Sequence, residues 1–399
     1  MDNQKTFPQG FLWGAATSSY QIEGGLINDW SEWEKSPRRI AELKKRGLNP
    51  LDYQSGRAAN SWEMMDEDIE CLKQINANAY RFSIEWSRIE PEEGRFDQAV
   101  INRYSELIAK LQNAGIEPFV TLWHWPLPLW LRDQGGWKSE KSIEYFKLFT
   151  ERVVQAFPTV KFWITLNEPE GYTGNGFLIG IWPPQQINIF NYHKVLKNLV
   201  AAHHASYAVI KEALPHAQIS IATPRAHFVS SSDPISYFFC KFASWWWNDR
   251  FLKRIINSID FIGLNYYWWI NVTLLSFSKT KGPKVSEIGW TINPDGLYYC
   301  LLDLQKYNKP IYITENGLAD AADSQRAWFI KSMLESILRA IGDGVDVRGY
   351  LHWSLLDNFE WAHGYDKKFG LFAVDYKTFQ RTARPSAYEY GLIAKNNSL

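Results

Sequence analysis

The chain has 399 residues, and its 43 Lys and Arg balance its 43 Asp and Glu, so the formal net charge is +0. A neutral chain lacks the basic field that draws nucleic acid or anionic lipid, so no nucleic-acid partner is expected. The length fits two or three ordinary domains or one large barrel. The order of the predicted elements has to decide between them.

Short apolar runs alternate along the chain with amphipathic helical patterns. The predicted strands span residues 11–17, 79–84, 118–123, 162–166, 219–223, 261–265, 311–314 and 349–353. Predicted helices between them include residues 66–75, 97–114, 142–156, 192–214 and 324–341. Alternating strands and helices predict a parallel sheet with right-handed crossovers. Eight repeats favour an α/β fold made of a single (β/α)8 barrel, a TIM barrel, as one domain over residues 1–399.

Polar or aromatic residues follow almost every predicted strand. They are Gln21 and Glu23, Arg81 and Ser83, His124 and Trp125, Asn167 and Glu168, Asn265 and Tyr267, Glu315 and Asn316, and Trp353. In a (β/α)8 barrel the active site forms at the carboxyl ends of the strands. We therefore expect these side chains to meet at one rim of the barrel.

Two glutamates close opposite strands of this predicted barrel. Glu168 ends the fourth strand and Glu315 ends the seventh. Hydrolysis of a glycosidic bond needs two carboxyl groups on either side of the anomeric carbon. Either glutamate taken alone is more typical of a surface ion pair. Together, each directly after an apolar strand, they favour catalysis, and a retaining mechanism requires them to lie about 5–5.5 Å apart.

Several sequence blocks resemble those of glycoside hydrolase family 1. Asn-Glu-Pro at 167–169 and Thr-Glu-Asn-Gly at 314–317 look like the two signatures of that family. Further matching blocks are residues 11–24, 81–89, 121–125, 263–267 and 352–361, with Gly364-Tyr365 and Phe369-Gly370 after them. The blocks cover nearly the whole chain and occur in order, so the resemblance is specific.

The resemblance implies a role for each matching residue. Glu168 becomes the acid/base and Glu315 the nucleophile of a retaining β-glycosidase. The residues implied in substrate binding are Gln21, His124, Asn167, Tyr267, Trp353, Glu360 and Trp361, with Trp353 as the floor under the sugar. Arg81, Asn265 and Trp290 are implied as supporting residues; Arg81 and Tyr267 are expected to contact Glu315, and Trp290 to line the leaving-group side.

The resemblance also implies a substrate class. Members that cleave 6-phosphoglycosides lack a carboxylate at the position of Glu360, so non-phosphorylated sugars are expected. Glucose is the first choice, with galactose and fucose as alternatives, carried on β-linked glucosides or short oligosaccharides. A transglycosidase with the same residues, and a sugar-binding barrel with weak activity, both remain open.

The chain departs from the family pattern on the leaving-group side. Arg225 follows strand five where the family usually places an asparagine, and Pro126 stands where an aspartate usually follows His-Trp. The loops after Glu315 and around residues 230–258 look shortened. The tryptophans at 245–247 and at 268–269 are more typical of packing than of sugar sites, and an exposed apolar patch for a partner is a further alternative.

Other features point away from metals, cofactors and membranes. Three widely spaced cysteines and the lack of H-E-x-x-H argue against a disulfide framework and a metal site, and no cofactor is expected. The first nine residues lack an apolar signal core, so a cytoplasmic location is expected. Residues 261–277 are apolar, but they are too short to span a bilayer, so no integral membrane segment is expected.

Overall fold

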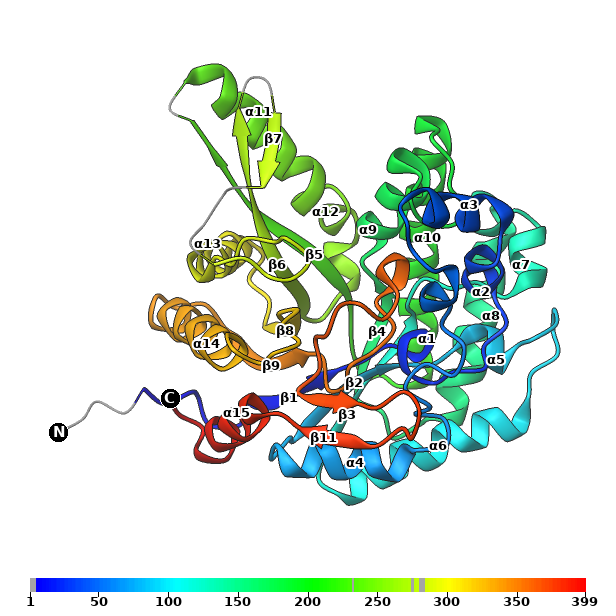
Figure 1. Cartoon of the computed structure of the whole chain (residues 1–399), viewed down its shortest axis with the longest axis horizontal. Coiled ribbons are helices and arrows are strands. Elements are labelled where there is room, and N and C mark those ends of the chain that lie inside the picture. Colours follow the sequence, from blue (N-terminus) through cyan, green and yellow to red (C-terminus); the bar gives the residue numbers. More distant parts are fainter. Residues whose placement is uncertain (1–4, 232, 274–275, 280–283) are drawn as a thin grey trace.

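A closed barrel of eight parallel strands forms the centre of the computed structural model, which describes residues 5–231, 233–273, 276–279 and 284–399 (Figure 1). The barrel strands are β1 (Leu12–Ala16), β2 (Ala79–Ser83), β3 (Glu117–Trp123), β4 (Phe162–Asn167), β5 (Gln218–Ser230), β6 (Ile262–Thr273), β8 (Ile311–Asn316) and β9 (Val347–Trp353). They pair in chain order, and the β1–β9 and β5–β6 pairings complete the ring. The predicted (β/α)8 barrel is confirmed.

Amphipathic helices cover the outside of the ring. The long ones are α4 (Met65–Gln74), α6 (Gln98–Asn113), α8 (Lys141–Ala156), α10 (Ile189–Ala213), α13 (Pro294–Leu304), α14 (Arg326–Gly342) and α15 (Pro385–Asn396). Local chemistry sets where they begin. The Asp97 side chain accepts hydrogen bonds from the backbone N–H groups of Ala99 and Val100, at 2.9 and 3.1 Å, and so caps the first turn of α6.

Shorter elements fill the connections between strands and helices. They include α1 (Ser19–Ile22), α2 (Asp29–Glu34), α3 (Pro37–Lys45), α5 (Trp86–Ile89), α7 (Leu129–Asp133), α9 (Pro169–Gly174) and the hairpin of β10 (Phe372–Val374) and β11 (Arg381–Ala383). Most of them follow the carboxyl ends of the strands. They therefore build the rim where the predicted site residues lie.

The inside of the barrel is packed in layers. Near the amino ends of the strands the rings of Phe119 and Phe162 stack with centroids 4.1 Å apart, and Phe261 and Tyr312 close around them. Trp353, the last residue of β9, belongs to the same buried cluster at the carboxyl end. The aromatic layer closes the barrel interior toward the amino ends of the strands, so the interior opens toward their carboxyl ends.

An arm rises from the barrel beside this rim (Figure 1). It is formed by the outer halves of β5 and β6, by β7 (Ser276–Lys279), which pairs antiparallel with β6, and by α11 (Pro234–Ser244). The predictions of short strands at 219–223 and 261–265 were therefore wrong at their carboxyl ends. The adjacent tryptophans at 268–269 interrupt the apolar and polar alternation that marks a strand. Residues 230–258, expected as a shortened loop, hold α11, the π-helix η4 (Trp245–Asp249) and α12 (Leu252–Ile255).

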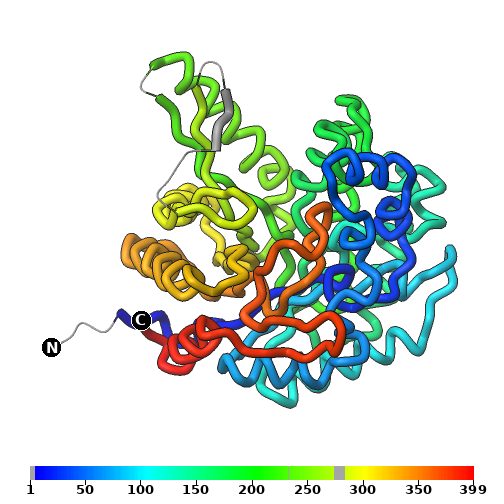
Figure 2. Tube along the Cα trace, viewed as in Figure 1, coloured from blue at the N-terminus to red at the C-terminus, as the bar shows by residue number. Residues whose placement is uncertain are grey.

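The two ends of the described chain meet at one edge of the barrel (Figure 2). The backbone N–H of Phe7 donates to the carbonyl of Asn397 at 2.9 Å, and that of Leu399 donates to the carbonyl of Lys5 at 3.0 Å. The Tyr390 hydroxyl of α15 donates to the Gly14 carbonyl of β1 at 2.7 Å. Among the described residues, no helix has the length and apolar character needed to cross a bilayer.

Candidate active site

A pocket of about 280 Å³ opens at the carboxyl ends of the barrel strands. Of the residues named from the sequence, it is lined by His124, Glu168, Tyr267, Trp290, Glu315, Trp353, Glu360 and Trp361. Four other predicted site residues do not line the pocket: Gln21, Arg81, Asn167 and Asn265. Each of them makes a hydrogen bond to a residue that does line it. The structure thus brings all twelve together around one cavity.

Glu315, at the end of β8, is held by a cation and a phenol. Arg81 Nη1 lies 2.5 Å from its Oε1, and the Tyr267 hydroxyl donates to its Oε2 at 2.7 Å. Burial raises the pKa of Glu315, whereas Arg81 and Tyr267 both favour its charged form. Of the two facing glutamates, Glu315 is therefore the one that ionises first.

Glu168 lies between β4 and α9, at the N-cap position of the helix. Its backbone is left-handed, with φ 41° and ψ 60°, a conformation that a glutamate rarely adopts. Asn265 Nδ2 donates to its Oε1 at 2.8 Å. Burial, and next the charge of Glu315, raise the pKa of Glu168 to about 8. The carboxyl group of Glu168 therefore keeps its proton at neutral pH.

Asn265 and Asn167 connect the two glutamates and orient their neighbours. The Thr314 hydroxyl donates to Asn265 Oδ1 at 2.7 Å, which turns Nδ2 toward Glu168. Asn265 Nδ2 also donates to Asn167 Oδ1 at 3.3 Å, and the nearby Asn265 side chain lowers the pKa of Glu315. Asn167 Oδ1 accepts from Arg81 at 2.6 Å, so that its Nδ2 faces His124. Both amides are held in one orientation.

His124 stays neutral beside this network. Its Nε2 lies 3.0 Å from Asn167 Nδ2 and serves as the acceptor of that hydrogen bond. Burial, and then the charge of Arg81, hold the pKa of His124 well below its ordinary value. A neutral imidazole can bind sugar hydroxyl groups without adding a positive charge close to Arg81.

A third carboxyl group, that of Glu360, also lines the pocket. Gln21 Nε2 donates to the Phe359 carbonyl at 2.9 Å and lies 3.3 Å from Glu360 Oε2. Burial and the charge of Glu315 raise the pKa of Glu360 to about 8. Glu360 can therefore both donate and accept hydrogen bonds near neutral pH.

The floor of the pocket depends on a close approach of two strand ends. A Cβ atom on Gly317 would lie 1.7 Å from the carbonyl oxygen of Trp353. Only glycine fits there, directly after the Glu315 strand. The ring of Trp353 faces the ring of His124 with an interplanar angle of 22°. The glycine of the Thr-Glu-Asn-Gly block thus sets the distance between Glu315 and the aromatic floor.

Four tryptophans also line the pocket although they were not predicted as site residues. They are Trp125, Trp182, Trp247 and Trp268. Trp125 lies next to His124 in a block that the sequence singled out, so its position was a usable signal. The other three, Trp182, Trp247 and Trp268, come from segments outside the sequence blocks that resemble the family. The expectation that the runs at 245–247 and 268–269 serve packing was incomplete, because Trp247 and Trp268 both face the cavity.

Two further sequence expectations meet the structure here. Glu23, which follows the first strand, accepts from Tyr104 at 2.6 Å and pairs with Arg88 at 3.1 Å, so it braces the rim. Arg225, expected after strand five, lies within the longer β5; it pairs with Asp249 and Asp303 and does not line the pocket. Over the residues that the structure describes, no group of three or more His, Cys, Asp and Glu has the arrangement of a metal site.

The geometry is suited to acid–base and nucleophilic chemistry on a sugar. One carboxyl group is protonated and another is held ready to ionise, on either side of a cavity with an aromatic floor. Aromatic faces stack on the apolar faces of sugar rings. The carboxyl groups and the imidazole of His124 that line the pocket can form hydrogen bonds with hydroxyl groups.

Comparisons with known proteins identify the family of the chain. The chain matches the model of glycosyl hydrolase family 1 over residues 3–236 and 247–399. It is 34% identical to β-glucosidase A of Thermotoga maritima, across 100% of this chain and 99% of that protein. It is 33% identical to β-glucosidase 42 of Arabidopsis thaliana, across 99% and 95% of the two chains.

Solved structures show the same architecture. A β-glycosidase from Pyrococcus horikoshii superposes with a TM-score of 0.91 at 36% identity, covering 99% of this chain and 96% of that one. The T. maritima β-glucosidase in complex with glucoimidazole superposes with a TM-score of 0.92 at 33% identity, covering 99% and 100%. The chain belongs to glycosyl hydrolase family 1 and is an O-glycoside hydrolase.

Proposed function

We propose that this enzyme removes terminal β-D-glucosyl residues from β-glucosides or short oligosaccharides, with retention of configuration. The observation that carries the proposal is the pair formed by Glu168 and Glu315, which line one pocket and lie near enough that the charge of Glu315 raises the pKa of Glu168. A retaining mechanism uses two such carboxyl groups, one as acid and one for direct attack on the anomeric carbon, whereas an inverting pair stands farther apart and leaves room for a water molecule.

In the first step, Glu315 acts as the nucleophile. Its carboxylate oxygen attacks the anomeric carbon while the bond from that carbon to the glycosidic oxygen breaks. Glu168 gives its proton to the departing oxygen, so the aglycone leaves as a neutral alcohol. The pKa of Glu168, raised to about 8, keeps this proton in place at neutral pH.

In the second step, Glu168 acts as the base. Once Glu315 is esterified its negative charge is gone, so one cause of the raised pKa of Glu168 disappears. Glu168 then takes a proton from water, whose oxygen attacks the anomeric carbon and releases Glu315. In this proposal Asn167, the residue before Glu168, binds the 2-hydroxyl, where contacts tighten in the oxocarbenium-like transition state.

Glucose is the preferred sugar in this proposal, with galactose and fucose as slower substrates. Glu360, held by Gln21, can bind the 4- and 6-hydroxyl groups and tolerates either configuration at carbon 4. A 6-phosphate would meet carboxyl groups and no Lys or Arg among the described lining residues. Unphosphorylated glycosides are therefore favoured.

A panel of nitrophenyl glycosides tests the proposal, with the product anomers followed by NMR. We expect the β-D-glucoside to be cleaved fastest, the galactoside and fucoside more slowly, and β-glucose to appear first. An α-product as the first anomer would exclude retention. Sugar transfer to an added alcohol that outpaces hydrolysis would indicate a transglycosidase, and binding without cleavage would indicate a sugar-binding barrel.

A further inference from the structure

A second cavity, an apolar groove, opens beside the catalytic pocket, between α11 and the outer parts of β5 and β6. It measures about 560 Å³, within the usual range for small-molecule sites. Phe228, Phe242, Ala243, Trp246 and Ile270 line it, together with Trp247 and Trp268. All seven side chains are apolar or aromatic, and the indole N–H groups of the three tryptophans are their only polar groups, so these described lining residues offer no charge for a phosphate and no side-chain acceptor for sugar hydroxyl groups.

The groove and the catalytic pocket share a wall. Trp247 and Trp268 line both cavities. Trp268 packs edge-on against Trp290, with centroids 4.7 Å apart, and Trp290 contacts Tyr267, the partner of Glu315. A Cβ atom on Gly174 of α9 would lie 3.8 Å from Trp247, and α9 begins directly after Glu168. The shared wall therefore adjoins the acid that protonates the leaving oxygen.

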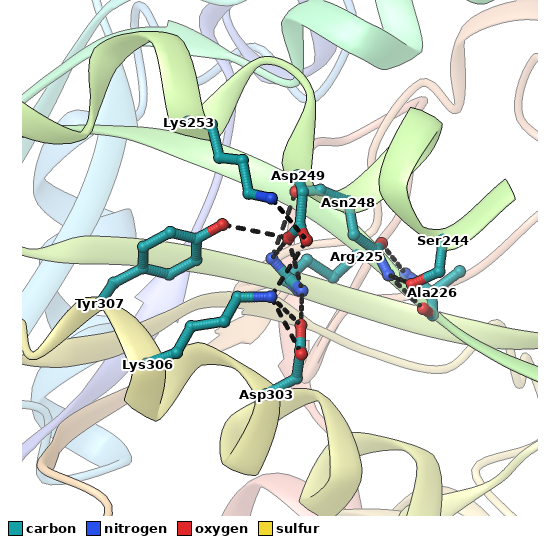
Figure 3. A network of polar contacts seen from close by, with 9 residues as sticks. All are labelled: Arg225, Ala226, Ser244, Asn248, Asp249, Lys253, Asp303, Lys306 and Tyr307. Carbon is teal, nitrogen blue, oxygen red and sulfur yellow. Dashed lines mark hydrogen bonds and ion pairs between the residues drawn. The ribbon is translucent and has the colours of Figure 1, made fainter. Parts of the chain in front are cut away.

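Polar contacts hold this wall in position (Figure 3). The Asn248 side chain donates to the Ala226 carbonyl at 2.9 Å and accepts from the Ala226 N–H at 3.0 Å, which fixes η4 against β5. Asp249 pairs with Arg225 at 3.3 Å and with Lys306 at 3.0 Å. The tryptophans at 246–247 thus stand on an anchored backbone, so that the groove is largely preformed.

Part of the groove lies outside the common family pattern. Residues 237–246 fall between the two segments that match the family model. These residues contribute Phe242, Ala243 and Trp246 to the groove. The groove is therefore built partly from a segment that lies outside the match to the family model.

We infer that the groove binds the hydrocarbon part of the substrate's aglycone, so that the preferred substrates are β-glucosides of long-chain or bulky apolar alcohols. The inference rests on the proposed function, because it assigns the leaving-group side of that same site. The sugar occupies the pocket at Glu360, the glycosidic oxygen lies at Glu168, and the hydrocarbon continues past Trp247 and Trp268 into the groove.

Alkyl β-D-glucosides from methyl to octyl, kept below their critical micelle concentrations, test the inference. The alcohols released from these glucosides have nearly equal pKa values. Chain length therefore changes how tightly the aglycone binds and leaves its ability as a leaving group unchanged. We expect kcat/KM to rise about two- to fourfold per methylene from butyl to octyl. If the enzyme cleaves nitrophenyl and methyl glucosides but its kcat/KM stays level or falls with chain length, the inference is overturned and the proposed function stands. An enzyme that cleaves none of these glucosides would overturn both.

Two groove variants and one surface variant localise the effect. Ala243→Phe fills the groove and Ile270→Asp places a charge in its wall, and neither residue lines the catalytic pocket. Each should lower the octyl-to-methyl ratio of kcat/KM at least tenfold. Ile235→Glu on α11, which is 54% exposed and does not line the groove, should leave the ratio unchanged. An unchanged ratio in both groove variants, or an equal loss in Ile235→Glu, would contradict the assignment.

Discussion

Arg81 links Glu315 on β8 to Asn167 on β4 and orients both side chains. It is fully buried, and its guanidinium contacts the Glu315 carboxyl, the Asn167 amide and the Thr314 carbonyl. Its planar fork can hold three partners at fixed angles, whereas a lysine offers a single point charge. Arg81 therefore acts as a positioning residue that also favours the charged form of Glu315.

Replacing Arg81 with methionine should change the pH profile as well as the rate. Without the cation the pKa of Glu315 rises, and since attack needs the carboxylate, the acidic limb of kcat/KM should move up by about 1–3 pH units. We expect kcat/KM to fall by about three orders of magnitude and Arg81→Lys to restore part of both properties. If the variant is slower but the acidic limb of its kcat/KM profile does not move, Arg81 contributes to packing and does not favour the charged form of Glu315.

The raised pKa of Glu168 carries a stability cost that depends on pH. Unfolded, this carboxyl ionises near 4.5, whereas in the fold it holds its proton to about 8. Between these values the folded state binds more protons, so the free energy of unfolding falls as pH rises. Glu168→Gln should therefore stabilise the fold at pH 8 by on the order of 2 kcal/mol and change little at pH 4.5.

Thermal melts at the two pH values measure this difference. Glu212→Gln, on the exposed face of α10, controls for the loss of one negative charge. An equal gain at both pH values, or the same gain in the control, would contradict the proposed protonation of Glu168.

At the scale of elements, the approach of β8 to β9 sets the floor of the site. Gly317→Ala would force a Cβ atom to within 1.7 Å of the Trp353 carbonyl, so the two strand ends must separate. We expect a loss of at least about 3 kcal/mol of stability and of most activity. Gly342→Ala, where no heavy atom lies within 4 Å and the residue ends α14, should be neutral or slightly stabilising in the same melts. Equal behaviour of the two variants would refute the close approach.

The barrel elements were predictable because each strand is a short apolar run between helical patterns. Glu168 and Glu315 could be found for the same reason, since each directly follows such a run. The outer halves of β5 and β6 were not predictable, because they leave the barrel and lose the buried environment that marks the inner halves. Trp247 and Trp268 reach one cavity from η4 and β6, and only the folded arm brings these segments together.

At the scale of the whole molecule, the closure of the barrel joins the two ends of the chain. The Tyr390 hydroxyl donates to the Gly14 carbonyl and accepts from the Gly14 N–H at 3.0 Å, and Trp13 donates to Asn397 at 2.9 Å. The last helix thereby holds the first strand in the ring. This arrangement supports our proposal that residues 1–399 form one domain.

One domain should unfold in one transition. Calorimetry of the wild-type enzyme is expected to show a single peak, and Tyr390→Phe should shift the whole peak to lower temperature at a cost of about 1–3 kcal/mol. Two resolved peaks, or a variant in which only part of the peak moves, would contradict the single unit.

The account depends most on a covalent bond between the sugar and Glu315. A 2-deoxy-2-fluoro-β-D-glucoside with a good leaving group slows the second step more than the first, so the glucosyl-enzyme should accumulate. We predict that mass spectrometry of the digested enzyme will find one fluoroglucosyl group, on the peptide that contains Glu315, with activity returning as the label is lost. An enzyme that turns over β-glucosides but carries no label, or carries it on Glu168, would contradict the assignment.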